Sequence, residues 1–311
     1  MKAFIFPGQG SQSVGMGAAL ATASAVARAV FEEVDDALGQ KLFKLMAEGP
    51  EDALQLTANA QPAIMANAIA TLRVLEREGG VRLAEKASYV AGHSLGEYTA
   101  LCAAGAFDLA TTAKLLRIRG DAMQAAVPVG VGAMAALLGA DLAKAQALAE
   151  AASEGEVCSV ANDNDPGQVV ISGHKGAIER AVVLVKEHDI KRGVLLPVSA
   201  PFHCPLMQPA ADKMAEALGE TTIQGPLVPL FANVIAAPVH DPAVIRDLLV
   251  QQVTGTVRWR ESIINMAAAG VTGTIELGGK VLSPMVKRCV PDMATASIIS
   301  MDDIEAILKE I

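Results

Sequence analysis

Residues 87–106 read ASYVAGHSLGEYTALCAAGA, and this stretch decides the fold class. Ala87 to Ala91 is a short apolar run that predicts a buried strand, and 95–106 has the pattern of a helix. Gly92-His93-Ser94-Leu95-Gly96 joins the two. A strand, a tight turn flanked by glycines and a helix are typical of an α/β protein with a parallel sheet.

The neighbouring segments extend this pattern. Ala3-Phe4-Ile5-Phe6 predicts a first buried strand, which Pro7-Gly8 ends. Helical periodicity follows in 17–39, in 61–77, where Gln61-Pro62 is predicted to start the helix, and in 109–126.

The middle of the chain has a different order of elements. Strands are predicted at Met134–Leu138, Val157–Ala161, Gln168–Ser172 and Gly193–Ser199, helices at 141–152 and 175–188, and a turn at 163–167. The order β-α-β-β-α-β is that of a ferredoxin-like unit. We therefore expect a small ferredoxin-like subdomain, 128–203, inserted in a larger core made of 1–127 and 204–311.

Composition excludes several classes of protein. The chain has 311 residues, with 25 Lys+Arg against 34 Asp+Glu and a net charge of −9, the reverse of a typical nucleic-acid binder. Residues 122–140 carry no charge, but Pro128 and several glycines interrupt them, so we expect a loop and a buried strand and no membrane segment. The N-terminus does not read as a signal peptide.

The cysteines point to a reducing compartment. The four cysteines are far apart, with no C-x-x-C pair and no histidine at ligand spacing. This argues against a metal site and against a disulfide framework, so we expect a cytoplasmic protein without a bound metal.

Ser94 is the candidate nucleophile. In a G-x-S-x-G turn the glycines allow a sharp bend that exposes the serine hydroxyl, and the helix that follows directs N–H groups at the site. The alternative is a glycine-rich helix start. Among the five histidines, His203 is the best candidate base, because it follows the last strand of the inserted unit, near the predicted junction of the two parts. It could also be a structural histidine in that junction.

Arg119 lies in the middle of the apolar face of the helix predicted at 109–126. A charge there needs a partner. That partner is either a buried carboxylate, in a structural ion pair, or the carboxylate of a substrate, which a guanidinium binds with two hydrogen bonds. Separately, the loop 6–12 lacks the ending of a P-loop and is better read as a backbone loop whose amides face an oxyanion.

Together these segments resemble the malonyl-CoA:acyl carrier protein transacylase family. The resemblance is carried by FPGQGSQ at 6–12, GHSLGEY at 92–98, Arg119-Gly120 and Pro201-Phe202-His203, and it covers nearly the whole chain, including 61–63 and 164–173. It implies an α/β-hydrolase-like core and transfer of malonyl from malonyl-CoA to the phosphopantetheine thiol of acyl carrier protein through a malonyl-serine intermediate, for fatty acid synthesis. It implies no cofactor, and we expect a monomer.

The resemblance also implies roles for individual residues. Ser94 matches the acylated serine, His203 its base and Arg119 the partner of the malonyl carboxylate. The backbone amides of Gln9 and Leu95 match the oxyanion donors, and the backbone carbonyl of Gln252 orients the histidine. For the acidic carrier protein, the candidate docking residues are Lys191, Arg192 and Lys287.

Two departures and several alternatives remain. The family usually has Gly-Pro-Gly-Lys where this chain reads Leu277-Gly278-Gly279-Lys280, which weakens the match beyond Leu277. Phe202 replaces a small residue that some members carry, and should narrow the pocket. The alternatives are a stand-alone acyltransferase that serves a polyketide synthase or malonate decarboxylase, a serine esterase or thioesterase, and a non-catalytic module that binds the carrier.

Overall fold

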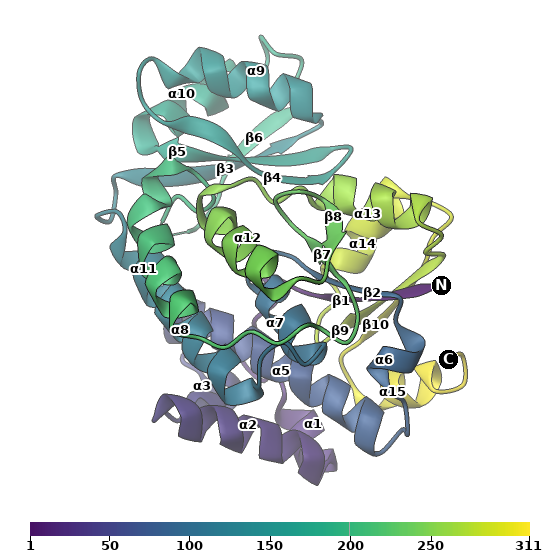
Figure 1. Ribbon diagram of the computed structural model, residues 1–311. Coiled ribbons are helices and arrows are strands. Elements are labelled where there is room, and N and C mark those ends of the chain that lie inside the picture. Colours follow the sequence, from purple (N-terminus) through teal and green to yellow (C-terminus); the bar gives the residue numbers. More distant parts are fainter. Residues whose placement is uncertain (199) are drawn as a thin grey trace.

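A computed structural model describes residues 1–198 and 200–311 of the chain, which form two β-sheets with helices packed around them (Figure 1). The larger sheet has the strand order β10-β9-β1-β2-β7-β8. Adjacent strands of this sheet pair in parallel, except that β7 and β8 pair in antiparallel orientation. Its strands are β1 (Lys2–Phe6), β2 (Tyr89–Gly92), β7 (Leu230–Ala232), β8 (Ala237–Val239), β9 (Gly273–Leu277) and β10 (Ala294–Ile298).

The smaller sheet is antiparallel and has the order β4-β5-β3-β6. Its elements follow one another as strand, helix, strand, strand, helix, strand, the order predicted from the sequence. They are β3 (Gly132–Leu138), α9 (Leu142–Ser153), β4 (Cys158–Asp165), β5 (Gln168–His174), α10 (Lys175–Leu184) and β6 (Arg192–Leu195). Figure 1 shows α9 and α10 together on the outer face of this sheet.

Most of the remaining helices surround the larger sheet. In chain order they are α1 (Ala18–Ala23), α2 (Ala25–Leu38), α3 (Leu42–Glu48), α4 (Glu51–Gln55), α5 (Thr57–Arg77), α6 (Leu83–Lys86), α7 (Leu95–Ala103), α8 (Leu109–Ala125), the 3-10 turn η1 (Pro205–Met207), α11 (Gln208–Gly219), α12 (Pro242–Thr254), α13 (Trp259–Ala268), α14 (Leu282–Cys289) and α15 (Met301–Ile307).

Both faces of the larger sheet are buried, as expected for parallel strands. In β1, Phe4 and Phe6 belong to the core formed with α5, α7 and α8, whereas Ala3 and Ile5 face α13 and α14. The alternation explains why the strand reads as a continuous apolar run in the sequence. A third, separate core lies between the smaller sheet and the helices α9 and α10.

Several boundaries differ from the sequence-based expectation. The helical stretch 17–39 is two helices, because Ser24 is extended and its hydroxyl caps α2 by accepting from the Ala27 N–H at 3.1 Å. Pro62 does not start its helix but lies inside α5, which begins at Thr57. The strand expected at Gly193–Ser199 is β6, Arg192–Leu195, and Ser199 lies outside the described residues.

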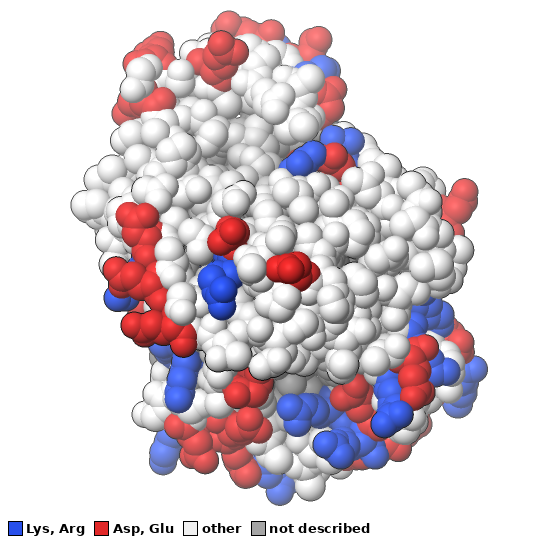
Figure 2. Space-filling view, in the orientation of Figure 1, with Lys and Arg blue, Asp and Glu red and all other residues white. Residues whose placement is uncertain are grey.

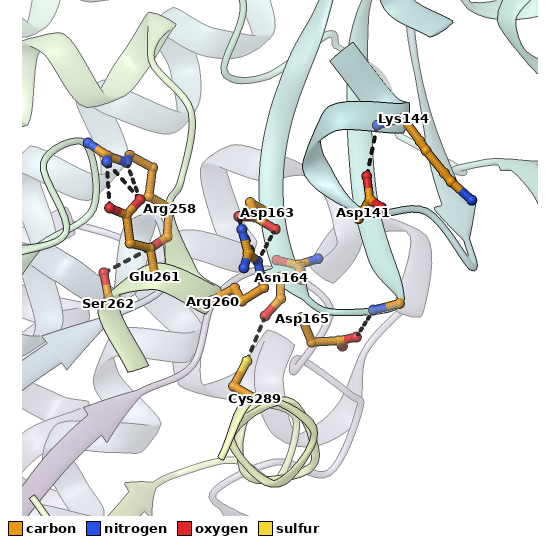
Figure 3. Close-up of polar contacts among 11 residues, drawn as sticks. Asp141, Lys144, Asp163, Asn164, Asp165, Arg258, Arg260, Glu261, Ser262 and Cys289 are labelled. Atoms are coloured by element: carbon orange, nitrogen blue, oxygen red, sulfur yellow. Dashed lines mark hydrogen bonds and ion pairs between the residues drawn. The ribbon is translucent and has the colours of Figure 1, made fainter. Parts of the chain in front are cut away.

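The largest difference is β4, which was expected to end at Ala161 but continues to Asp165. Its polar end, 162–165, is buried and packs against α13 and α14. Asp163 pairs with Arg260 of α13, with both carboxylate oxygens 3.0 Å from Nε (Figure 3). Asp165 pairs with Arg288 of α14 at 2.7 Å. The predicted turn is therefore shorter than expected: it is confined to Pro166-Gly167, and contacts with segments about a hundred residues away keep 163–165 in the strand.

Within the described ranges, none of the helices is long and apolar enough to cross a bilayer. The uncharged stretch 122–140 forms the end of α8, a loop and β3, as the sequence indicated.

Candidate active site

The turn after β2 is a strained elbow that exposes Ser94. Ser94 has φ 54° and ψ −111°, outside the regions that a serine normally adopts. The flanking glycines are required by space: a Cβ on Gly92 would lie 1.9 Å from the backbone of Gly96, and one on Gly96 would lie 2.3 Å from the carbonyl oxygen of Phe6. The predicted strand, turn and helix are thus present, and the turn is packed too tightly for other residues.

The structure brings Ser94 and His203 together across 109 residues of sequence. Ser94 Oγ and His203 Nε2 are 2.8 Å apart, and His203 Nδ1 lies 2.8 Å from the backbone carbonyl oxygen of Gln252. Because that carbonyl can only accept, Nδ1 carries the proton and Nε2 is free to accept one from Ser94. Burial, together with the charge of Arg119, lowers the pKa of His203 to about 3, so the ring is neutral at physiological pH.

Arg119 also lies in this group, and it is 1% exposed. Its Nη2 is 3.1 Å from Ser94 Oγ and 2.9 Å from Gln252 Oε1, and Nη1 is 2.8 Å from Gln61 Oε1. Among residues 1–198 and 200–311, no carboxylate forms an ion pair with Arg119, and its buried Nε has no hydrogen-bond partner. Of the two readings of this arginine, a direct structural ion pair is therefore not what the described residues show.

A pocket of about 460 Å³ opens beside these side chains. Gln9, Ser94, Leu95, Arg119 and His203 all line it, so the structure gathers the predicted site residues in one place. Its walls come from both sheets, because Met134, Asn162 and the segment 196–198 belong to or follow strands of the smaller one. Phe202 also lines the pocket and is 7% exposed.

The backbone N–H groups of Gln9 and Leu95 have no acceptor within the part of the chain that the structure describes. The N–H of Ser94 itself is occupied, since it donates to Asn233 Oδ1 at 2.8 Å.

The loop that carries Gln9 packs on the elbow: a Cβ on Gly8 would lie 2.7 Å from the carbonyl oxygen of His93. The His93 ring donates in turn to Asn164 Oδ1 of β4 at 2.8 Å, and burial lowers its pKa.

The sequence reasoning missed two buried residues, Glu97 and Asn233. Glu97 is 1% exposed and follows the elbow in the first turn of α7, within the quoted motif, where a carboxylate between apolar neighbours was the available signal. Asn233 follows β7 and had no local signal. Gln252 was expected to act through its backbone, but its side chain also contacts Arg119 and Glu97.

The candidate docking residues lie apart from the pocket. Lys191 and Arg192 are exposed at the edge strand β6, and Lys287 is exposed on α14, where its Nζ donates to the Pro291 carbonyl at 3.2 Å. None of the three lines the pocket. In the face shown in Figure 2, acidic side chains gather along α11, which carries the exposed residues Asp212 and Glu216.

Comparison with known proteins gives consistent matches over nearly the full chain. A family model described as acyl transferase domain matches residues 3–297. The malonyl CoA-acyl carrier protein transacylase of Escherichia coli K12 is 46% identical over 299 residues, 96% of this chain and 95% of that protein. The acyl-carrier-protein-S-malonyltransferase of Bartonella henselae superposes with a TM-score of 0.97 at 52% identity, covering 99% of this chain and 98% of that one.

A further solved structure holds a malonyl-transacylase in complex with its type II PKS acyl-carrier protein. It is 40% identical to this chain, with a TM-score of 0.96, and the match covers 100% of this chain and 99% of that one.

Proposed function

The chain belongs to the malonyl CoA-acyl carrier protein transacylases, within the acyl transferase domain family, and we propose that it moves malonyl from malonyl-CoA to the phosphopantetheine thiol of acyl carrier protein in fatty acid synthesis. The observation that carries the proposal is the buried guanidinium of Arg119 beside Ser94, 3.1 Å from its hydroxyl and without a carboxylate partner among the described residues.

The proposed chemistry has two half-reactions. Ser94 Oγ attacks the malonyl thioester while its proton moves to His203 Nε2, and the His203 proton then leaves with the CoA thiol. The Ser94–malonyl ester remains. The carrier's thiol next gives its proton to His203 and attacks that ester, which returns Ser94 Oγ and its proton. In this dyad Gln252 supplies the orientation of the histidine that an aspartate supplies in a triad.

Two backbone amides are proposed to hold the oxyanion of each tetrahedral intermediate. Gln9 and Leu95 line the pocket, and their N–H groups have no competing acceptor among the described residues. Each such donor typically lowers the activation barrier by roughly 3–4 kcal/mol.

Selectivity for malonyl is proposed to come from Arg119. A substrate carboxylate would pair directly with the guanidinium and acetyl-CoA offers no group that could, and removing one partner of a buried charge pair typically costs roughly 3–5 kcal/mol. The buried cation beside the nucleophile favours a malonyl transferase over a general esterase or thioesterase, whose substrates carry no such carboxylate.

We propose that the division of labour follows the two sheets. The core of 1–127 and 204–311, hydrolase-like in its elbow and parallel sheet, carries the chemistry, and the inserted ferredoxin-like subdomain, 128–203, forms the other pocket wall. Lys191 and Arg192 remain our proposed docking site for an acidic carrier, with Lys287 a weaker one. The acidic side chains along α11 make that face a poor docking surface (Figure 2).

We propose further that the protein is a monomer and needs no cofactor. Every group in the proposed mechanism is a side chain or backbone atom of this one chain, which favours a monomer without a cofactor. We propose a cytoplasmic location, because the four widely spaced cysteines suit a compartment that keeps thiols reduced. The chain is similar to a malonyl-transacylase solved in complex with a type II PKS acyl-carrier protein, which makes polyketide synthesis the second candidate pathway.

The test is intact mass and peptide mapping after mixing with malonyl-CoA and no acceptor. One malonyl group on the peptide that contains Ser94, discharged by holo acyl carrier protein, is the expected result. Release of CoA without a lasting adduct would instead identify a hydrolase. Comparing a fatty acid and a polyketide carrier as acceptor separates the two pathways.

A further inference from the structure

Glu97 is a buried carboxylate for which the mechanism above has no task. Its Oε2 accepts hydrogen bonds from Gln252 Nε2 at 2.6 Å and from the Asn233 N–H at 3.3 Å. The side chain is 1% exposed, and no ion pair reaches it within the described ranges. An ionised carboxylate in such a place needs a positive charge nearby to offset its lost hydration.

That positive charge lies one side chain away. Gln252 donates from Nε2 to Glu97 and accepts at Oε1 from Arg119 Nη2 at 2.9 Å. The amide of Gln252 is also held by the Ser94 carbonyl oxygen, 3.0 Å from Nε2. Its orientation is therefore fixed, with the nitrogen toward the anion and the oxygen toward the cation. Glu97, Gln252 and Arg119 form one chain of hydrogen bonds that ends at the nucleophile.

Few other charges act on this carboxylate. Arg119 of α8 is the charged group that stabilises its ionised form, and Tyr98 on its own helix is a neutral phenol whose pKa burial raises further. His203 is neutral, because burial and Arg119 lower its pKa to about 3. From α5, Arg73 acts on the far end of α7. Burial outweighs the attraction of Arg119 and raises the pKa of Glu97 to about 7.

We propose that Glu97 is the resident counter-ion of Arg119, acting through Gln252, and that it takes up one proton from solvent when a substrate carboxylate pairs with Arg119. This inference rests on the proposed function. Before binding, Arg119⁺ and Glu97⁻ sum to zero. The malonyl carboxylate would bring the buried group to −1, and protonation of Glu97 restores neutrality. Transfer of malonyl to the carrier removes the second carboxylate, and the proton is released again.

The expected signature is a coupling between binding and pH. At about pH 8 Glu97 is ionised in the free enzyme, so binding of malonyl-CoA should take up nearly one proton. At about pH 6 the carboxyl group is already protonated, and the uptake should fall toward zero. As pH increases from 6 to 8, the Kd for malonyl-CoA should rise by up to about tenfold per pH unit, because binding needs a proton that becomes scarcer. Acetyl-CoA has the same nucleotide but no acyl carboxylate, and should show neither effect.

The experiment is titration calorimetry of the Ser94→Ala protein with malonyl-CoA and acetyl-CoA, in two buffers of different ionisation enthalpy, at about pH 6 and pH 8. Ser94→Ala prevents acylation, so only binding is measured. The difference between the two ligands counts the protons that belong to the malonyl carboxylate. An uptake approaching one proton at the higher pH and near zero at the lower supports the proposal.

A second variant assigns the proton to Glu97. In Ser94→Ala/Glu97→Gln, the amide oxygen can still accept from Gln252 and Asn233, but the group cannot titrate, so the uptake should vanish. Ser94→Ala/Glu97→Asp retains a carboxylate and should restore it. Equal uptake with and without Glu97→Gln, or no uptake at about pH 8 by a protein that binds malonyl-CoA, overturns the inference. A protein that binds both ligands equally well contradicts the proposed function instead.

Discussion

The side-chain oxygen of Asn233 accepts the backbone N–H of Ser94 at 2.8 Å, so the nucleophile's own amide points away from the reaction and into the protein. The same side chain donates to the Gly92 carbonyl oxygen at 2.7 Å and thereby bridges both sides of the elbow. Ser94 has an unfavourable backbone conformation, and a strained turn persists only where its surroundings fix it. Asn233 is one of the groups that fix it.

Asn233→Ala should therefore lower kcat more than it raises KM. The substitution removes the bonds to Ser94 and Gly92 and a third, weaker one from Gln252 Nε2 at 3.3 Å. Their loss should cost about 1–3 kcal/mol of unfolding free energy, and kcat for malonyl transfer should fall at least about tenfold. Chemical denaturation and steady-state kinetics measure the two effects. Asn265→Ala, which removes a single hydrogen bond from an exposed asparagine of α13, is the matched control. Equal kinetics in both variants would refute the role of Asn233.

Arg119→Ala should remove the preference for malonyl. We expect kcat/KM for malonyl-CoA to fall by a factor that corresponds to about 3 kcal/mol or more of lost transition-state stabilisation. The ratio of malonyl to acetyl transfer should fall toward one. Arg117→Ala is the control on the same helix, since Arg117 faces away from the pocket and contacts Gln40 and Asn59. A ratio that stays unchanged in Arg119→Ala would show that the carboxylate binds elsewhere.

Phe202→Ala should widen the pocket beside the acyl group. Phe202 lines the pocket and is nearly buried, so truncation should allow methylmalonyl-CoA to acylate the enzyme while malonyl transfer persists. The measurement is the ratio of the two kcat/KM values. Comparable use of methylmalonyl-CoA by the unmodified enzyme would already contradict the idea that Phe202 restricts the pocket.

The pH profile of acylation should lack the usual histidine titration. Because the pKa of His203 is lowered to about 3 from 6.5, the ring stays neutral and able to accept a proton throughout the range from about 4 upward. With acetyl-CoA, which avoids the coupling to Glu97, the acid limb of kcat/KM should lie well below pH 6. An acid limb near 6.5 would mean that His203 is solvated in the working enzyme.

The lowered pKa of His203 should also make the stability of the protein depend on pH. A group whose pKa is lowered on folding binds its proton in the unfolded chain first, so the free energy of unfolding should decrease as pH falls from 6.5 toward 3. Denaturation of His203→Gln, which removes that group, should depend less on pH over this window than denaturation of the parent protein.

The two ion pairs that hold β4 against the larger part, Asp163–Arg260 (Figure 3) and Asp165–Arg288, should differ in strength. The Asp163 carboxylate is 2% exposed and its charged partner is Arg260, whereas Asp165 also accepts the Gly167 N–H at 3.0 Å. Arg260→Ala should thus destabilise the protein by up to about 3 kcal/mol, and Arg288→Ala by less. Restoration of stability in Asp163→Ala/Arg260→Ala would confirm that the unpaired carboxylate is the cause; the reverse order of the single variants would contradict it.

The sequence predicts those features that depend on neighbours along the chain. The elbow at Ser94 needs glycines at fixed spacing, and the buried strand at β1 needs a run of apolar residues, so both could be recognised. The end of β4 could not, because Asp163 and Asp165 are buried by arginines that are far away in sequence. For the same reason Asn233 escaped notice. Glu97 was visible as a residue, but its contact with Arg119 runs through Gln252, whose side chain no local pattern places.

The two edges of the smaller sheet are shielded in different ways. At one edge the residues of β4 are covered from within: the Asp163 N–H donates to the Val257 carbonyl oxygen, and the Val257 N–H to Ala161, each at 2.9 Å. At the other edge, no strand of residues 1–198 and 200–311 pairs with the outer side of β6, and the exposed residues Lys191 and Arg192 lie at its start. Lysine and arginine on an open edge discourage the addition of a strand from another molecule.

The charges of Lys191 and Arg192 therefore serve two proposed functions, binding of the carrier and protection of the β6 edge from self-association. Lys191→Glu and Arg192→Glu reverse the sign but keep the edge charged, so they should leave the protein dispersed in solution while changing its affinity for an acidic partner. Uncharged replacements would confound the two, because aggregates and weakened docking both reduce turnover.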